Sequence, residues 1–308
     1  MANVGAVYPP EMWAARALMY LENVKIIANL VDRNFEDEVK EQGDIIHTRS
    51  RAAIGLVEKA NNGSAVTFGA PDATDVAIEL RYHTIAPFYI TDRDIHTSID
   101  TLVSDYIEPC VDPIADLVDQ RLLNGDLAGY STDGHGLLDT TLVGNTAVVG
   151  GAYGLATLAQ TRADMRANKV PLNPGSVSVV MGTTHEGEAT AQSEFIAADF
   201  TGEEMPGIRT GLIGNKLGMN HYASQNVQDL SGNARSVAFH RQAMALVTRP
   251  LAVPPDGMGV RGGNLERNGL GLRVVMSWDH NSFCWKISYD LLWGFRLLNG
   301  NLAQRITG

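Results

Sequence analysis

Residues 91–124 read TDRDIHTSIDTLVSDYIEPCVDPIADLVDQRLLN, and their apolar side chains keep a helical period longer than any other stretch of the chain. The apolar positions recur at steps of three and four: Ile95, Ile99, Leu102, Val103, Tyr106, Ile107, Val111, Ile114, Leu117, Val118 and Leu122. This spacing predicts an amphipathic helix that places one face on a core. Thr91 with Asp94 has the form of a capping box at its start, and Asn124 with Gly125 marks its end.

The opposite face of this segment is acidic, so it points towards water or towards a neighbouring chain. A helix of this length extends about 45 Å, far beyond the average helix of a globular protein. Pro109 and Pro113 interrupt it, and each costs about 3 kcal/mol in a helix interior. Either the helix bends near the prolines, or two helices share one apolar face. We expect a bent spine helix, because the apolar period continues unchanged to Leu122.

The composition is that of a soluble globular protein. The chain has 308 residues, 44% of them hydrophobic and 19% charged, enough for one large or two modest cores. A net charge of −11 argues against a basic face that grips nucleic acid. Cys110 and Cys284 are the only cysteines, and we expect two buried free thiols in a reducing cytoplasm. The sequence has neither a membrane-spanning apolar run nor a signal peptide, so we expect no membrane contact.

The segments before residue 91 predict a helix and a long hairpin. A helix is expected from Glu11 to about Leu30, followed by a strand at DIIHTRS. From about Asp44 to Ile90 the sequence is β-like, with an Asn-Gly turn and with alternating apolar residues at Val76, Ile78, Leu80 and Tyr82. An isolated two-stranded ribbon is marginal in water. We therefore expect the hairpin to find its cover on another subunit.

The rest of the chain predicts an α+β pattern with many turns. The expected elements are a helix ending before Pro171, a buried strand at 176–181, a short helix around His185 to Ile196, a glycine-rich turn and strand near 207–224, a helix over 234–249 closed by Pro250, and a hairpin turning at Asp279 to Ser282. In that last hairpin Val274, Met276 and Trp278 alternate on one strand, and Phe283, Trp285 and Ile287 alternate on the other.

No stretch carries the residues of a catalytic site. Gly182 and Gly187 have the spacing of a phosphate-binding loop, but Glu188 and Ala189 stand where that loop needs Lys and Ser or Thr. The eight histidines occur singly, and His185-Glu186 lacks the second histidine of a zinc helix. We therefore assign no catalytic, cofactor-binding or metal-binding residue and expect a protein that is not an enzyme.

Three stretches carry a resemblance to a known family. They are PPEMWAARALMYLENVKIIANLVDRNFEDEVKEQGDII at 9–46, RANKVPLNPGSVSVVMG at 166–182, and ISYDLLWGFRLLNGNLAQRI at 287–306. With the order of predicted elements, they make the chain resemble the major capsid (coat) proteins of tailed bacteriophages, in the branch of short-tailed phages. The resemblance implies the Hong Kong 97 phage capsid fold over nearly the whole chain.

The resemblance implies a division into five parts. These are an N-terminal arm and helix at 1–43, an E-loop hairpin at 44–90, a P-domain with the spine helix at 91–150, an A-domain at 151–250, and returning strands at 251–308. The loops are too short for the inserted domain of some members. Some members also link subunits covalently between Lys and Asn, but Lys59 is the only lysine of the E-loop here, and we do not expect that linkage.

The implied function is an icosahedral shell of hexamers and pentamers around a phage genome, built in the bacterial cytoplasm. The implied partners are other copies of the chain, a scaffolding protein, a portal and weakly held double-stranded DNA, with room for a decoration protein. No cofactor is implied. An encapsulin-like compartment shell is the alternative within the same fold. A soluble enzyme of unrecognised type is the alternative from another class.

Overall fold

The structure is a computed structural model. It describes residues 10–24, 26–35, 45–49, 58–59, 65, 68, 75–91, 106–125, 135–192, 214–229, 232–255, 260–267 and 270–308.

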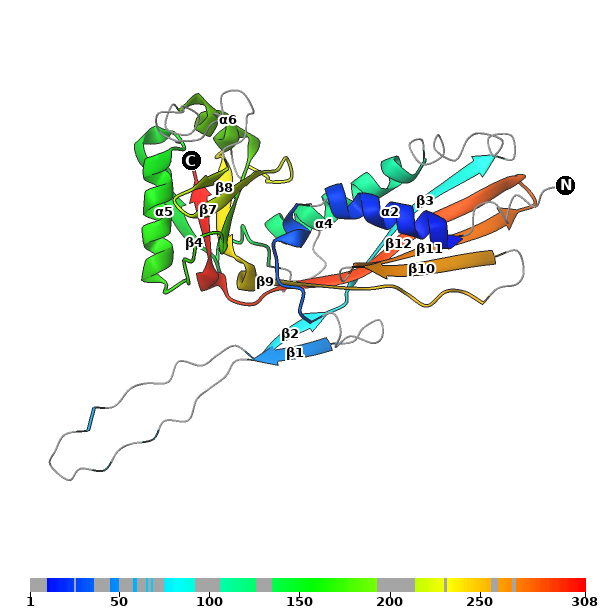
Figure 1. Cartoon of the computed structure of the whole chain (residues 1–308), viewed down its shortest axis with the longest axis horizontal. Coiled ribbons are helices and arrows are strands. Elements are labelled where there is room, and N and C mark those ends of the chain that lie inside the picture. The colour runs from blue at the N-terminus through cyan, green and yellow to red at the C-terminus, as the bar shows by residue number, and fades with distance from the viewer. Residues whose placement is uncertain are drawn as a thin grey trace.

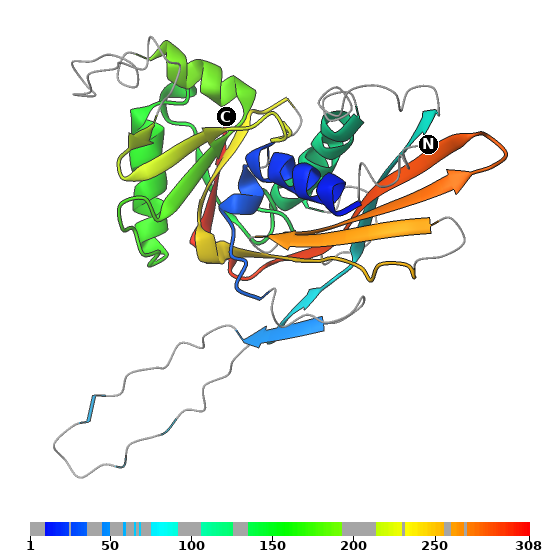
Figure 2. The same ribbon diagram turned by 45° about the vertical axis from the view of Figure 1, so that its right-hand side comes forward.

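Two helices and five strands form an elongated part of the molecule, here called the spine lobe (Figure 1). Its elements are α2 (Pro10–Val24), α4 (Glu108–Asn124), β3 (Tyr82–Thr91), β9 (Met244–Arg249), β10 (Val260–Arg267), β11 (Leu270–Asp279) and β12 (Cys284–Leu297). The strands lie in the order β10-β11-β12-β3, all antiparallel, and β9 pairs with the end of β12. Both helices lie on one face of this sheet, as the turned view in Figure 2 shows.

Side chains alternate between the two faces of the spine-lobe sheet. On β12, Ile287, Tyr289 and Leu291 are buried in the cluster that also contains the apolar faces of α2 and α4. On α4, that cluster includes Val111, Ile114 and Val118. The intervening residues of β12 lie on the opposite face, because successive side chains of a strand point to opposite sides. We call that opposite face, which neither helix covers, the outer face.

A second unit, the α5–α6 lobe, holds a six-stranded sheet. Its elements are β4 (Gly144–Ala147), α5 (Leu155–Ala167), β5 (Val177–Met181), α6 (Thr183–Ala191), β6 (Asn215–Lys216), β7 (Met219–Ala223), β8 (Arg235–His240) and β13 (Ala303–Thr307). The strand order is β4-β13-β8-β5-β7-β6. The pairs β5–β7 and β13–β4 are parallel, and the other pairs are antiparallel.

The central strands of this lobe are buried on both faces. Val180, Val237 and Phe239 belong to the large cluster that continues into the spine lobe. Val177, Val179 and Met181 belong to a second cluster under α5. A strand covered on both sides reads as a continuous apolar run, and this accounts for the sequence SVSVVM. The predictions of this buried strand and of a helix ending before Pro171 are confirmed.

A small ribbon projects from the spine lobe. It consists of β1 (Ile45–Arg49) paired antiparallel with β2 (Asp75–Glu79), and it leads away from both lobes (Figure 1). The chain between them is described only at 58–59, 65 and 68, so the predicted Asn-Gly turn lies outside the described residues. The strand predicted across 76–85 is broken at Leu80 and Arg81, because β2 pairs with β1 whereas β3 joins β12.

The described part of the spine segment is helical through both prolines. Tyr106 and Ile107 form a π-helical turn that runs directly into α4. Pro109 lies in the first turn of α4, where its missing N–H costs little, and Pro113 lies inside the helix. Thr91, the predicted N-cap, is the last residue of β3. The segment 92–105 lies outside the described residues, so the prediction of a continuous helix through both prolines is confirmed only from Tyr106 onwards, and its bend stays a prediction.

The first helix is shorter than predicted. It ends at Val24, and a 3₁₀ turn, η1 (Ile27–Asn29), follows. Asp119 of α4 holds this turn, since its carboxylate accepts hydrogen bonds from the backbone N–H of Ile26 at 3.0 Å and of Ala28 at 3.3 Å. Burial raises the pKa of Asp119, and the bonds from Ile26 and Ala28 oppose that shift.

The helix predicted over 234–249 is wrong. The segment forms β8 and β9, joined by a short 3₁₀ turn, η6 (Arg241–Ala243). Nearly every residue of both strands is buried, on both faces of a sheet. Apolar residues therefore occur without the two-residue alternation of a half-exposed strand, and such a run resembles a buried helix.

The remaining predicted elements are found with shifted ends. The short helix predicted from His185 begins at Thr183, and its described part ends at Ala191. The glycine-rich turn is Leu217–Gly218 between β6 and β7, and both residues have positive φ. The last hairpin pairs Asp279 with Cys284. Phe283 therefore lies in its turn, with φ 47°, and not in the strand where it was predicted.

Candidate assembly surfaces

The base of the projecting ribbon is covered by the chain itself. Ile78 and Leu80 are buried against Ala245, Val247 and Leu292, which lie on β9 and β12. For Ile78 and Leu80, this contradicts the prediction that the apolar residues of the hairpin need a second subunit for cover. The ribbon crosses the outer face of β12 at Gly294, so the sheet to which it is attached covers its base.

The outer part of the hairpin keeps an uncovered aromatic side chain. Phe68 is 92% exposed, and Glu58 and Lys59 are also exposed. A large apolar side chain at this exposure loses the roughly 1.5–3 kcal/mol that burial contributes. Phe68 is therefore the described residue of the hairpin for which an intermolecular contact is still expected.

The outer face of the spine-lobe sheet is a second uncovered surface. On the edge strand β3, Ile85 is 51% and Tyr89 is 65% exposed, and the exposed Pro87 lies between them. Phe88 and Ile90, on the alternate positions, contribute to the core. Residues 85–90, IAPFYI, are apolar or aromatic on both faces, so the sequence does not show which face is covered, and our reading of the alternation ended at Tyr82 and His83.

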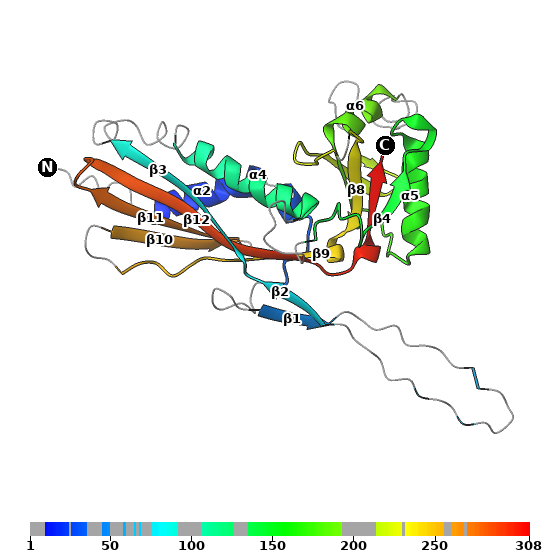
Figure 3. The ribbon, with the colours of Figure 1, turned by 180° about the vertical axis from the view of Figure 1, so that it is seen from behind.

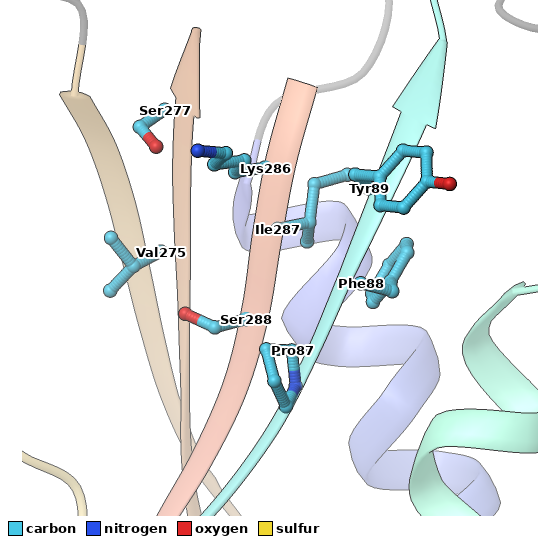
Figure 4. Close-up of a pocket in the computed structure, with 8 residues that line it drawn as sticks. All are labelled: Pro87, Phe88, Tyr89, Val275, Ser277, Lys286, Ile287 and Ser288. Atoms are coloured by element: carbon cyan, nitrogen blue, oxygen red, sulfur yellow. The ribbon is translucent and has the colours of Figure 1, made fainter. Parts of the chain in front are cut away.

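A shallow depression of about 300 Å³ lies on this face. Its lining comes from three neighbouring strands: Pro87, Phe88 and Tyr89 of β3, Val275 and Ser277 of β11, and Lys286, Ile287 and Ser288 of β12. Figure 4 shows the amine of Lys286 lying towards Ser277 across two adjacent strands. Lys286 also forms an ion pair with Asp279 at 2.6 Å. The depression thus has a mainly apolar lining, and its one charged lining residue, Lys286, is already paired with Asp279.

The other end of the outer face is closed by an ion-pair cluster. The single Nε–H of Arg273 on β11 is shared between the two carboxylate oxygens of Asp290 on β12, each 3.0 Å from Nε, and Nη2 pairs with the same group. His83 of β3 reaches Asp290 at 3.1 Å. Asp290 is only 4% exposed, and a buried carboxylate needs such partners. These contacts fix three strands in register.

The segment 250–255 covers the neighbouring part of the same face. A methyl group added at Gly271 would lie 2.1 Å from the Pro250 ring, and one added at Gly262 would lie 2.6 Å from Val253. Arg273 also donates to the Ala252 carbonyl at 2.7 Å. The surface that stays open is therefore the part around Ile85, Pro87 and Tyr89.

The segment that resembles a phosphate-binding loop has a different role. Gly182 lies so close to the Arg235 carbonyl that an added methyl group would be 2.8 Å away, whereas one at Gly187 would meet nothing. Glu188 accepts a hydrogen bond from the Tyr153 backbone N–H at 2.6 Å. The first glycine thus serves packing, and the carboxylate links α6 to the segment before α5.

The other sequence candidates are not brought together. Within the described residues, no group of three or more His, Cys, Asp and Glu side chains is placed to hold a metal ion. Cys110 is half-buried, Cys284 is buried, and both are free. Over the same residues, no helix is long and apolar enough to cross a membrane.

Comparison of the fold identifies proteins of similar structure. A chain from Mycobacterium phage Che8 aligns with a TM-score of 0.63 and 20% identity, over 92% of this chain and 90% of that chain. The capsid structure of cyanophage P-SCSP1u gives a TM-score of 0.59 and 15% identity, over 92% and 87%. The capsid of an empty GTA particle gives 0.59 and 15%, over 94% and 89%.

No protein-family model and no curated protein matches the sequence. At these identities the structural likeness establishes the fold. The alignments cover most of the chain, 92% and 94% of it. The chain has the fold of the major capsid proteins of tailed bacteriophages, the Hong Kong 97 type.

Proposed function

We propose that this protein is the subunit of an icosahedral shell that encloses the genome of a tailed bacteriophage. The observation that carries the proposal is the alignment from end to end with capsid chains, over 92–94% of this chain and 87–89% of theirs. The alignment therefore covers most of the length of each of these capsid chains.

The uncovered surfaces support self-association. Tiling a shell needs many modest contacts that repeat by symmetry. Phe68, in the chain between β1 and β2, and Tyr89, on the outer face, are two exposed aromatic side chains in different parts of the molecule. Aromatic residues are enriched at protein interfaces. We propose that the ribbon of one subunit reaches a neighbour and buries Phe68 there.

The finer parts of the proposal follow the family resemblance. The subunits form hexamers and pentamers, and a scaffolding protein and a portal take part in assembly in the bacterial cytoplasm. The net charge of −11 suits a wall that holds double-stranded DNA only by weak, non-specific contacts. The division into arm, E-loop, P-domain and A-domain at 43/44, 90/91, 150/151 and 250/251 belongs to the same proposal. Three strands cross these boundaries, because β3 and β9 pair with β12 in the spine lobe and β4 pairs with β13 in the α5–α6 lobe.

Electron microscopy of the purified full-length protein, with and without a co-expressed scaffolding protein, tests the proposal. We expect closed shells, or hexameric and pentameric capsomers that close when scaffold is present. Sedimentation analysis gives the mass of the same species. A stable monomer or dimer under all these conditions would contradict the proposal and would favour the soluble-enzyme class.

The contents of native particles separate the two shell functions. A phage capsid recovered from lysed host cells contains double-stranded DNA. An encapsulin-like compartment contains a protein cargo and no genome. Nuclease-protected DNA measured in purified particles therefore supports the capsid, and protein-filled particles without DNA would support the alternative.

A further inference from the structure

A buried histidine connects three elements of the α5–α6 lobe. His185 lies in the first turn of α6 and is 1% exposed. Its Nδ1 is 2.7 Å from the Ser236 hydroxyl of β8. Its ring stacks on Tyr153, with ring centroids 5.0 Å apart and planes inclined by 23°. His185 Nε2 and the Tyr153 hydroxyl are both buried without a hydrogen-bond partner among the described residues.

These contacts are the polar attachment of α6 to the rest of the lobe. Glu188, one turn after His185, accepts the hydrogen bond from the Tyr153 N–H. Tyr153 directly precedes Gly154, the N-cap of α5. The His185 and Glu188 side chains together therefore hold α6 on β8 and on the start of α5. A change at His185 affects its contacts with both Ser236 and Tyr153.

A protonated imidazole does not fit this environment. The imidazolium ring carries two N–H donors, and Ser236 can accept only the one on Nδ1. The proton on Nε2 would be a buried donor for which the described residues provide no acceptor, and such a donor carries its full desolvation cost. This holds for either tautomer of the neutral ring, because protonation fills both nitrogens.

The charged groups around the ring are few and do not remove this cost. Glu188 on α6 and Asp229 before β8 favour the protonated form, but burial lowers the pKa of His185 more than they raise it. Arg235 on β8 also interacts electrostatically with Asp229. From α5 the ring meets only the Tyr153 phenol, whose pKa burial raises well above its ordinary value.

We propose that His185 is a proton-sensitive latch that holds α6 on β8 and on the start of α5 at neutral pH and releases it in acid. The inference does not depend on the function proposed above. Because the folded form binds the proton more weakly than the released form, the latch is fully closed above pH ~6.5. It loses stability as the pH falls from that value towards the lower pKa of the folded form.

Hydrogen–deuterium exchange of the full-length protein tests the proposal. Amide protection of residues 183–192 is measured at pH 7.5 and pH 5.8, corrected for the intrinsic exchange rate. We expect the amide protection of α6 to fall by up to about fivefold, because pH 5.8 lies about 0.7 unit below the ordinary histidine pKa of ~6.5. The protection of β11 and β12 should not change. His185→Gln, which carries no proton at either pH, should show the same α6 protection at both.

Two further variants keep the test decisive. His280→Gln, in the exposed turn between β11 and β12, should behave as the wild type. Ser236→Ala removes the acceptor for Nδ1 and should lower α6 protection already at pH 7.5. Unchanged protection in the wild type at pH 5.8, or an equal loss in His185→Gln, would overturn the proposal. If His185→Gln does not fold, unchanged protection in the wild type at pH 5.8 still overturns the proposal, and Ser236→Ala tests the contact from its other side.

Discussion

Two glycines of this chain, Gly294 and Gly187, differ in the space that their surroundings leave for a side chain. Gly294 on β12 lies under the chain that leads from β2 to β3, and an added methyl group would be 2.0 Å from the Glu79 carbonyl oxygen. Gly187 lies inside α6, where an added methyl group would meet nothing within 4 Å. The first position requires glycine for a close approach of two backbones. The second carries only the entropic disadvantage of glycine in a helix.

Alanine at each position should therefore change stability in opposite directions. We expect Gly294→Ala to destabilise the subunit by about 1–3 kcal/mol, because backbone must move to make room. We expect Gly187→Ala to stabilise it by about 0.5–1 kcal/mol. Denaturant unfolding of the unassembled subunit measures both. Equal effects of the two changes would show that the close approach at Gly294 is not required.

At the scale of elements, the joint between η1 and α4 depends on one carboxylate. Asp119→Ala leaves the N–H groups of Ile26 and Ala28 without their acceptor, and a buried donor without a partner costs about 1–3 kcal/mol. Asp116→Ala, one turn earlier at an exposed position, is the matched control and should stay within about 0.5 kcal/mol. Chemical denaturation compares the two variants. A similar small effect in both would contradict the role given to Asp119.

The projecting ribbon allows folding and assembly to be separated. Deleting residues 59–74 removes Phe68 but keeps β1, β2 and the buried Ile78 and Leu80. We expect a folded, soluble subunit that no longer closes into shells, seen by circular dichroism and electron microscopy. Phe68→Ala should weaken assembly in the same direction without loss of subunit stability. Normal shells from the deletion variant would remove the ribbon from the interface.

The elements that we predicted correctly have an apolar period that fits only one type of secondary structure. The helix of residues 155–167 and the hairpin of β11 and β12 were predicted because each is covered on one face. Strands β8 and β9 were missed because they are covered on both. The break between β2 and β3 was missed because it depends on their different partners, β1 for β2 and the distant β12 for β3. Patterns along the sequence do not contain such contacts.

At the scale of the whole molecule, the family resemblance predicted the fold that periodicity alone left open. The exposed surface around Ile85, Pro87 and Tyr89 was not predicted, since the pairing of β3 with β12 decides which of its faces is uncovered. The buried environment of His185 was also missed, because it depends on Tyr153 and Ser236 from distant segments. A single histidine in a sequence carries no sign of such neighbours.

One hydrophobic cluster runs through both lobes, from α2 and α4 to Val180, Val237 and Phe239. Because the lobes share this core, we expect the unassembled subunit to unfold in one cooperative transition. Differential scanning calorimetry checks this, with the calorimetric enthalpy compared with the van't Hoff enthalpy. Two separated transitions would mean that the lobes are independent folding units.

Strand β12 also forms the connection between the two lobes along which a force on the subunit would act. It pairs with β11 and β3 over its first part and with β9 over its last, and the chain then continues into β13 in the other lobe (Figure 3). Its 14 residues extend about 46 Å. A tensile force that separates the lobes therefore acts along this strand. It loads the hydrogen bonds between β12 and its neighbouring strands in shear, so that many of them resist at once. A pressurised wall built from such subunits would be stiffest along the direction of β12.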